Sequence, residues 1–168
     1  MKIKIALIMF ICTAGMAQAQ NAAIDTVAKK AITDLAFITG QWEGSGWMIG
    51  VDGVRHEFTQ SENIRFKLDT TAILIEGKGF AGGRMVHNAM AVIRFNATEN
   101  RFDFYSFLSS GKEGVFKAFI ENGELVWYLN EGMKYTVRID DKGNWYEKGE
   151  MNMGESWFQF FETNLHRK

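Results

Sequence analysis

The stretch that decides the fold reads Phe37-Ile38-Thr39-Gly40-Gln41-Trp42-Glu43-Gly44-Ser45-Gly46-Trp47. Gly40 is a typical helix stop, and the Gly-x-Trp opening with two further alternating glycines begins a strand. Strand-rich sequence continues from there to the end of the chain. We therefore predict an all-β fold, a small antiparallel meander barrel that follows one N-terminal helix, with Trp42 plugging the barrel base.

Residues 1–19 have the pattern of a secretory signal peptide. Lys2 and Lys4 precede an apolar run from Ile5 to Cys12, and Ala17-Gln18-Ala19 matches a small-x-small cleavage site. The run is shorter than the ~20 residues that a membrane span needs. We expect a periplasmic or secreted protein after signal cleavage near Ala19. The alternative is that this segment is retained as an anchor.

Cleavage would also change the chemistry that the chain can perform. Cys12 is the only cysteine, so the mature protein would have no disulfide, thiolate metal site or cysteine nucleophile. Loss of Lys2 and Lys4 lowers the count of lysine plus arginine from 19 to 17, against 20 acidic residues. Such a surface does not attract nucleic acid.

The chain after the signal divides into a helical segment over 20–40 and a barrel domain over 41–168. Apolar residues at helical spacing predict one helix over 22–38. Beyond it, turn signals at short intervals separate segments rich in Val, Ile, Phe, Tyr and Trp, which predicts about ten strands joined by hairpins. Asn122-Gly123 is the strongest of these hairpin signals.

Three motifs carry a family resemblance. They are Gly40-Gln41-Trp42-Glu43-Gly44-Ser45-Gly46-Trp47, Phe58-Thr59-Gln60-Ser61-Glu62, and Leu74-Ile75-Glu76-Gly77-Lys78-Gly79. The chain resembles an uncharacterised bacterial calycin (lipocalin-like) domain family of unknown function, distantly similar to the haem-binding nitrobindins. The last strand, Trp157 to Leu165, resembles the same family. This resemblance implies a barrel with an internal cavity and implies no established reaction.

Haem is not expected as a cofactor. In the nitrobindins that the chain resembles, a histidine of the last strand holds the iron, and Phe160 stands at that position here. Phenylalanine cannot coordinate iron. His87 and His166 are the remaining candidates for an axial ligand. No His-x-His or His-x-x-x-His pair occurs, so the spacing gives no support for a zinc site.

Strand alternation suggests which residues would line a ligand cavity. The candidate wall residues are Trp47, Phe58, Phe66, Phe104, Trp127, Tyr135 and Trp145, and the candidate polar anchors are Gln60, Glu62 and Glu76. Pairing through a turn centred at Asp69-Thr70 would place Glu62 close to opposite Glu76. The two carboxylates would then serve either as a structural salt-bridge network or as a headgroup anchor or acid/base pair.

These observations favour an exported lipocalin-like protein that binds a small apolar or amphipathic molecule. The alternative is a barrel enzyme, an isomerase or hydrolase with a glutamate general base, or a nitrobindin-like haem protein. No Gly-x-Ser-x-Gly elbow supports nucleophilic catalysis. Aromatic residues on both faces of 104–107 and 157–161 need cover outside the barrel, supplied either by the helix or by a second copy in a homodimer.

Overall fold

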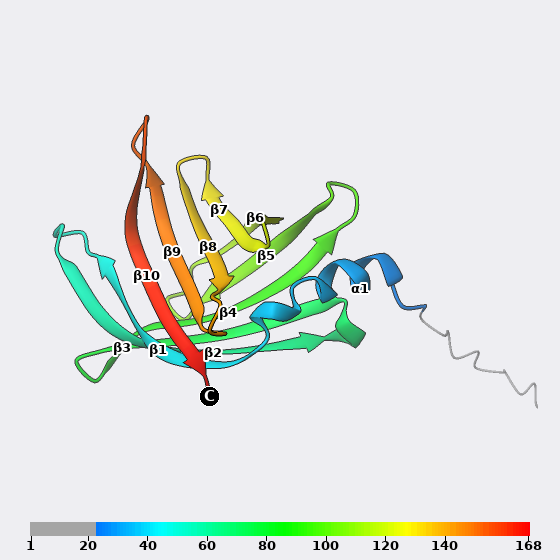
Figure 1. Cartoon of the computed structure of the whole chain (residues 1–168), viewed down its shortest axis with the longest axis horizontal. Coiled ribbons are helices and arrows are strands. Elements are labelled where there is room, and N and C mark those ends of the chain that lie inside the picture. Colours follow the sequence, from blue (N-terminus) through cyan, green and yellow to red (C-terminus); the bar gives the residue numbers. More distant parts are fainter. Residues whose placement is uncertain (1–22) are drawn as a thin grey trace, which may run out of the picture.

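The computed structural model describes residues 23–168 and shows a closed ten-stranded barrel (Figure 1). The strands are β1 (Gly40–Ile49), β2 (Arg55–Lys67), β3 (Ala72–Ala81), β4 (Arg84–Asn96), β5 (Arg101–Leu108), β6 (Glu113–Glu121), β7 (Glu124–Asn130), β8 (Met133–Ile139), β9 (Trp145–Asn152) and β10 (Trp157–Arg167). Each strand pairs antiparallel with its neighbour in sequence, and β1 pairs with β10 to close the sheet. This confirms the predicted meander barrel. The predicted signal peptide lies outside the described residues.

The segment before β1 forms two short helices rather than the single helix predicted over 22–38. They are α1 (Thr26–Thr33), capped by the Asp25 side chain on the Ala28 N–H at 2.9 Å, and the 3₁₀ helix η1 (Ala36–Ile38). Ile32, Leu35 and Ile38 are fully buried. Ile32 belongs to α1, Leu35 directly precedes η1 and Ile38 ends it, so both helices contribute to one buried core. Within residues 23–168, no helix is long and apolar enough to cross a membrane.

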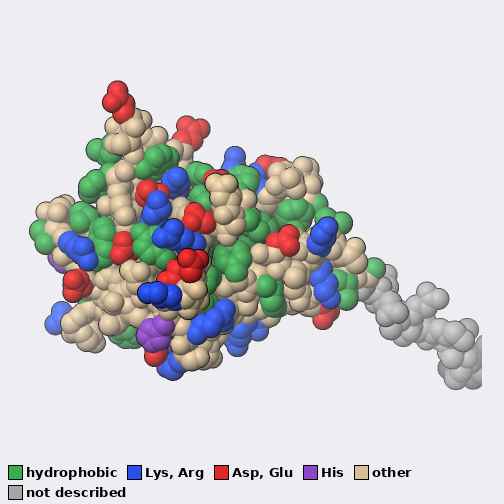
Figure 2. Space-filling view, viewed as in Figure 1, with side chains coloured by type: hydrophobic (Ala, Val, Ile, Leu, Met, Phe, Trp, Pro, Cys, Tyr) green, Lys and Arg blue, Asp and Glu red, His purple; other side chains and the backbone are tan. Residues whose placement is uncertain are grey.

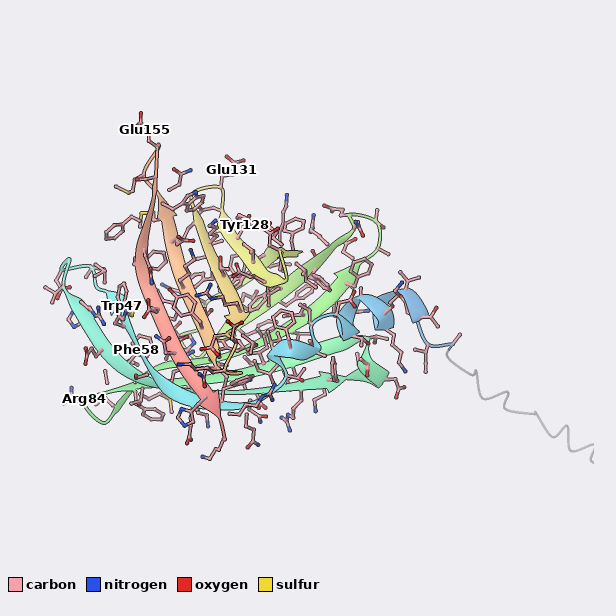
Figure 3. The ribbon with its side chains drawn as sticks, in the orientation of Figure 1. Trp47, Phe58, Arg84, Tyr128, Glu131 and Glu155 are labelled. Atoms are coloured by element: carbon pink, nitrogen blue, oxygen red, sulfur yellow. The ribbon has the colours of Figure 1, made fainter. Side chains whose placement is uncertain are left out.

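The helices close one end of the barrel. Ile32, Leu35 and Ile38 belong to the same core as the inward residues Ile73 and Ile93. This closed end also carries η2 (Leu68–Thr70), which α1 contacts. The hairpins β1–β2, β3–β4, β5–β6, β7–β8 and β9–β10 surround the opposite, open end. Glu131, Glu155 and Arg84 mark three of these hairpin tips in Figure 3.

Trp42 seals the closed end, as predicted. Its indole N–H donates a hydrogen bond to the Ile38 carbonyl at 2.9 Å, and its ring lies 5.7 Å from that of Trp145. The Arg167 guanidinium lies over the Trp42 ring, 4.3 Å from the ring centroid. Trp42 therefore joins β1, β10 and η1 at the closed end of the barrel.

Gly44 and Gly46 allow the seam between β1 and β10 to close. A Cβ atom at Gly44 would clash with the Asn164 carbonyl oxygen, and one at Gly46 would clash with that of Glu162. Any larger residue would force the two strands apart. The alternating glycines of the opening motif are thus explained by the close approach of two backbones.

Candidate functional site

The barrel encloses a cavity of about 550 Å³. Ile38 of η1 forms part of its floor, and Met48, Val86 and Leu108 lie along the walls toward the open end. This volume falls in the range of ~300–1,000 Å³ that is usual for small-molecule sites. The cavity is therefore the candidate functional site.

One wall of the cavity is aromatic. The rings of Phe104 and Trp127 stack at 4.7 Å between centroids, and those of Trp127 and Tyr135 stack at 4.5 Å. Phe160 and Phe161 both meet Tyr135 edge-on, at 5.7 and 5.3 Å. Two consecutive phenylalanines reach the same ring because β10 is irregular between Gln159 and Phe161, where a β-bulge interrupts the alternation.

Glu62 lies in the cavity wall on β2 and is only 7% exposed. The Gln60 amide donates a hydrogen bond to its Oε1 at 2.6 Å, whereas its Oε2 has no hydrogen-bond partner among the described residues. Burial raises the pKa of Glu62 to about 7, and the hydrogen bond from Gln60 acts in the opposite direction.

Gly77 makes the space for this carboxyl group. It lies directly opposite Glu62 on β3, and a Cβ atom there would be 2.6 and 2.8 Å from the two carboxyl oxygens. Contacts below 3 Å would push Glu62 out of place. The glycine is therefore part of the site.

Glu147 on β9 is the second buried acid of the cavity, at 9% exposure. The Thr163 hydroxyl donates a long hydrogen bond of 3.4 Å to its Oε2. Burial first, and then the charge of Glu62, raise the pKa of Glu147 to about 8. The charge of Glu62 thus disfavours ionisation of Glu147. Within residues 23–168, neither carboxyl group takes part in an ion pair.

Two neutral donors complete the polar part of the cavity. Burial and the nearby Glu147 charge raise the pKa of Tyr135, so its hydroxyl group keeps its proton. The buried indole N–H of Trp145 makes no hydrogen bond in the described part of the chain, although Trp145 favours the charged form of Glu147. The site thus offers carboxyl acceptors, hydroxyl and indole donors, and an extended apolar wall.

The structure brings most of the sequence-predicted site residues together. Seven line the cavity: Phe58, Gln60, Glu62, Phe104, Trp127, Tyr135 and Trp145. Phe66 points to the inside as well but packs on the core at the closed end. Trp47 lies outside, where the Arg55 guanidinium covers its ring at 4.4 Å. Trp47 and Phe58 are labelled on β1 and β2 in Figure 3.

The predicted pairing of Glu62 with Glu76 is wrong. Glu76 pairs with Asn63, lies on the outer face of β3, and forms a salt bridge with Arg65. The turn is centred on Asp69 and Thr70, as predicted, and this register places Gly77, one position beyond Glu76, opposite Glu62. A shift of one residue moves a side chain to the other face of a sheet.

Sequence reasoning missed Glu147, the actual partner of Glu62. It shares parity with Trp145, which was assigned to the wall, so the same alternation argument could have placed it inside. Glu147 was missed because its neighbours Tyr146 and Lys148 are polar, as in a strand that is exposed to solvent.

The three histidines occupy different places. His87 on β4 lines the cavity near the open end, and burial lowers its pKa. His56 contacts Asp52 in the β1–β2 hairpin. His166 lies on the outside, 3.7 Å from Glu43. No group of three or more His, Asp or Glu side chains within residues 23–168 is arranged to hold a metal ion.

Two solved structures have a fold similar to that of this chain. The crystal structure of Rv2717c from M. tuberculosis matches with a TM-score of 0.60 and 14% identity, covering 82% of this chain and 97% of that one. The S-type phycobiliprotein lyase CPES from Guillardia theta matches with a TM-score of 0.55 and 9% identity, covering 87% and 98%. At these identities the likeness shows the fold alone. No protein-family model and no curated protein matches the chain.

Proposed function

We propose that this is an exported lipocalin-like protein that binds a small apolar or amphipathic molecule in its barrel cavity, without a bound cofactor. The observation that supports the proposal best is the cavity of about 550 Å³, closed at one end by η1 and walled by stacked aromatic rings. An apolar ligand gains free energy by leaving water for such a site. Export rests on the signal pattern of residues 1–19.

Titration with N-phenyl-1-naphthylamine, a neutral dye that fluoresces in apolar surroundings, tests the proposal. We expect saturable binding to the mature protein and strong loss of binding in Ala89→Trp, which would fill the cavity. Met90→Trp is the matched control, because the adjacent side chain is exposed on the outer face of β4. Absence of saturable dye binding, or equal binding by both variants, contradicts the proposal.

An enzyme is the second candidate, because two buried carboxyl groups with raised pKa face a cavity, as general acid/base catalysis requires. Glu76 cannot be the general base of such an enzyme, because its side chain lies on the outer face of β3. Catalysis would convert a bound molecule, so NMR of the recovered molecule would show a product of changed mass after hydrolysis, or of the same mass and a different structure after isomerisation. Glu147→Gln would abolish the conversion without abolishing binding.

A haem protein would have to use His87, because His166 lies outside the cavity. Titration with hemin tests this version directly. A Soret band that disappears in His87→Ala would support it.

A further inference from the structure

We infer that the Glu62–Glu147 pair recognises a nitrogen-bearing polar group, an ammonium or other N–H donor, on an aromatic or hydrocarbon ligand. The inference rests on the proposed binding function and narrows it from any amphipathic molecule to amphipathic amines. It assigns the deep part of the cavity to the ligand's polar end and the aromatic wall to its apolar body.

The first support is the imbalance of hydrogen-bonding groups. Glu62 is more than nine-tenths buried, lines the cavity, and has an oxygen without a partner in the described residues. Glu147 accepts only the long hydrogen bond from Thr163. Four carboxyl oxygens therefore face few donors, and a buried acceptor left unpaired is costly. A ligand with several N–H groups would satisfy them.

The second support is charge. Arg65 pairs with Glu76 on the outside, and Lys148 pairs with Glu150 on the face of β9 that is opposite Glu147 in the alternation. In the described part of the chain, no lysine or arginine neutralises the buried pair. Lys112 lines the cavity, but from the β5–β6 loop at the open end. Burial disfavours the ionised form of both acids, and a cationic ligand would supply the partner that the ionised form needs.

The third support is the space kept free beside the pair. Gly77 leaves room for the Glu62 carboxyl, and any side chain there would displace it. Two further inward positions, Gly44 and Gly46 of β1, carry no side chain, which leaves room beside Gln60 and Thr163, whereas Trp42 lies beside Glu62. Glu62 and Glu147 both line the cavity, so a ligand that enters it meets the residues that carry the two carboxyl groups.

Charge also argues against the obvious lipocalin ligands that carry a carboxylate. An anionic headgroup at this depth would meet two buried acids, of which Glu147 already resists ionisation because of the charge of Glu62. A fatty acid would have to bind protonated or with its headgroup at the open end, near Lys112. The pair thus discriminates between ligands of the same shape and different charge.

Three naphthyl compounds of nearly equal size test the inference: 1-naphthylmethylamine, 1-naphthalenemethanol and 1-naphthoic acid. Each compound competes against N-phenyl-1-naphthylamine in a displacement titration of the mature protein at pH 7, and its affinity is measured. We expect the amine to bind at least about tenfold more tightly than the alcohol, and the acid to bind most weakly. Glu62→Gln and Glu147→Gln should each reduce the preference for the amine about tenfold and leave affinity for the alcohol nearly unchanged. Glu76→Gln, on the outside, is the matched control.

The outcomes separate the two proposals. If the dye binds but the alcohol or the acid competes as well as the amine, or if none of the three competes, the inference is overturned and the binding function stands. If the dye itself does not bind, the binding function fails as well. The comparison among the three compounds uses the wild-type protein, so it holds even if a glutamine variant does not fold.

Discussion

At the scale of single residues, Glu62 and Glu147 set how stability responds to pH. Both pKa values are higher in the folded protein than the ordinary 4.5, at about 7 and about 8. The folded state therefore binds more protons than the unfolded chain between about pH 4.5 and 8. The pair's contribution to stability is fully present below pH 4.5 and is lost as pH rises through these folded values.

We expect this loss to reach several kcal/mol in the free energy of unfolding between pH 5 and 8.5, because each unit by which a pKa is raised corresponds to about 1.4 kcal/mol. Urea denaturation at several pH values measures it. In the double variant Glu62→Gln/Glu147→Gln the decline should flatten, because neither amide can ionise. Glu76→Gln should keep the wild-type slope. A double variant with an unchanged slope would show that other groups set the pH response.

A second prediction at this scale concerns the stability that Trp42 contributes. Replacing it with alanine removes the hydrogen bond to Ile38 and the contact with Trp145, and leaves a void at the closed end. Trp42→Ala should lower the free energy of unfolding by about 3–5 kcal/mol, as for other large core truncations. Trp47→Ala is the comparison, because that indole lies on the outside. A cost under about 1 kcal/mol for Trp42→Ala would contradict its role as the plug.

At the scale of elements, the N-terminal helices and the barrel stabilise each other by packing. Eight residues of α1 are too few for a stable isolated helix, so packing on β3, β4 and η2 holds it. Leu35→Ala should cost about 2–5 kcal/mol, because Leu35 is fully buried in the core. Val27→Ala, on the exposed side of α1, should cost far less. Chemical denaturation compares them, and equal effects would mean that the helices do not seal the barrel.

The number of strands could be predicted from the sequence, whereas part of the candidate site could not. Hairpin signals such as Asn122-Gly123 and the glycines of β1 are local, so ten strands and closure of the sheet were predictable. The register of β2 and β3 was predictable as well, because a turn centred on Asp69 and Thr70 places Gly77, not Glu76, opposite Glu62. The pairing of Glu62 with Glu147 joins strands far apart in sequence, and alternation within one strand carries no information about which strands face each other across a barrel.

At the scale of the whole molecule, apolar residues remain exposed on the outer face of β4, β5 and β6. Met90 pairs with Phe107, and Val115 lies on the next rung beside Tyr105. Phe107 is 39% exposed and Val115 59%. The contacts of α1 with the sheet are to β3 and β4, so the helix leaves this patch open. Figure 2 shows hydrophobic side chains reaching the surface between charged ones on the face viewed there.

We propose that a second copy of the chain covers this patch, defined by Met90, Tyr105, Phe107 and Val115. Burying apolar area contributes ~25 cal/mol per Å², and symmetric dimers are the commonest oligomers. Sedimentation velocity at micromolar concentration should therefore give the mass of a dimer. Phe107→Asp/Val115→Asp should shift it to a monomer, because two buried charges would face their own copies across the symmetry axis. Val54→Asp, on the exposed β1–β2 hairpin, should leave the dimer intact. A wild-type protein that sediments as a monomer would rule out the dimer and leave the patch as ordinary exposed surface.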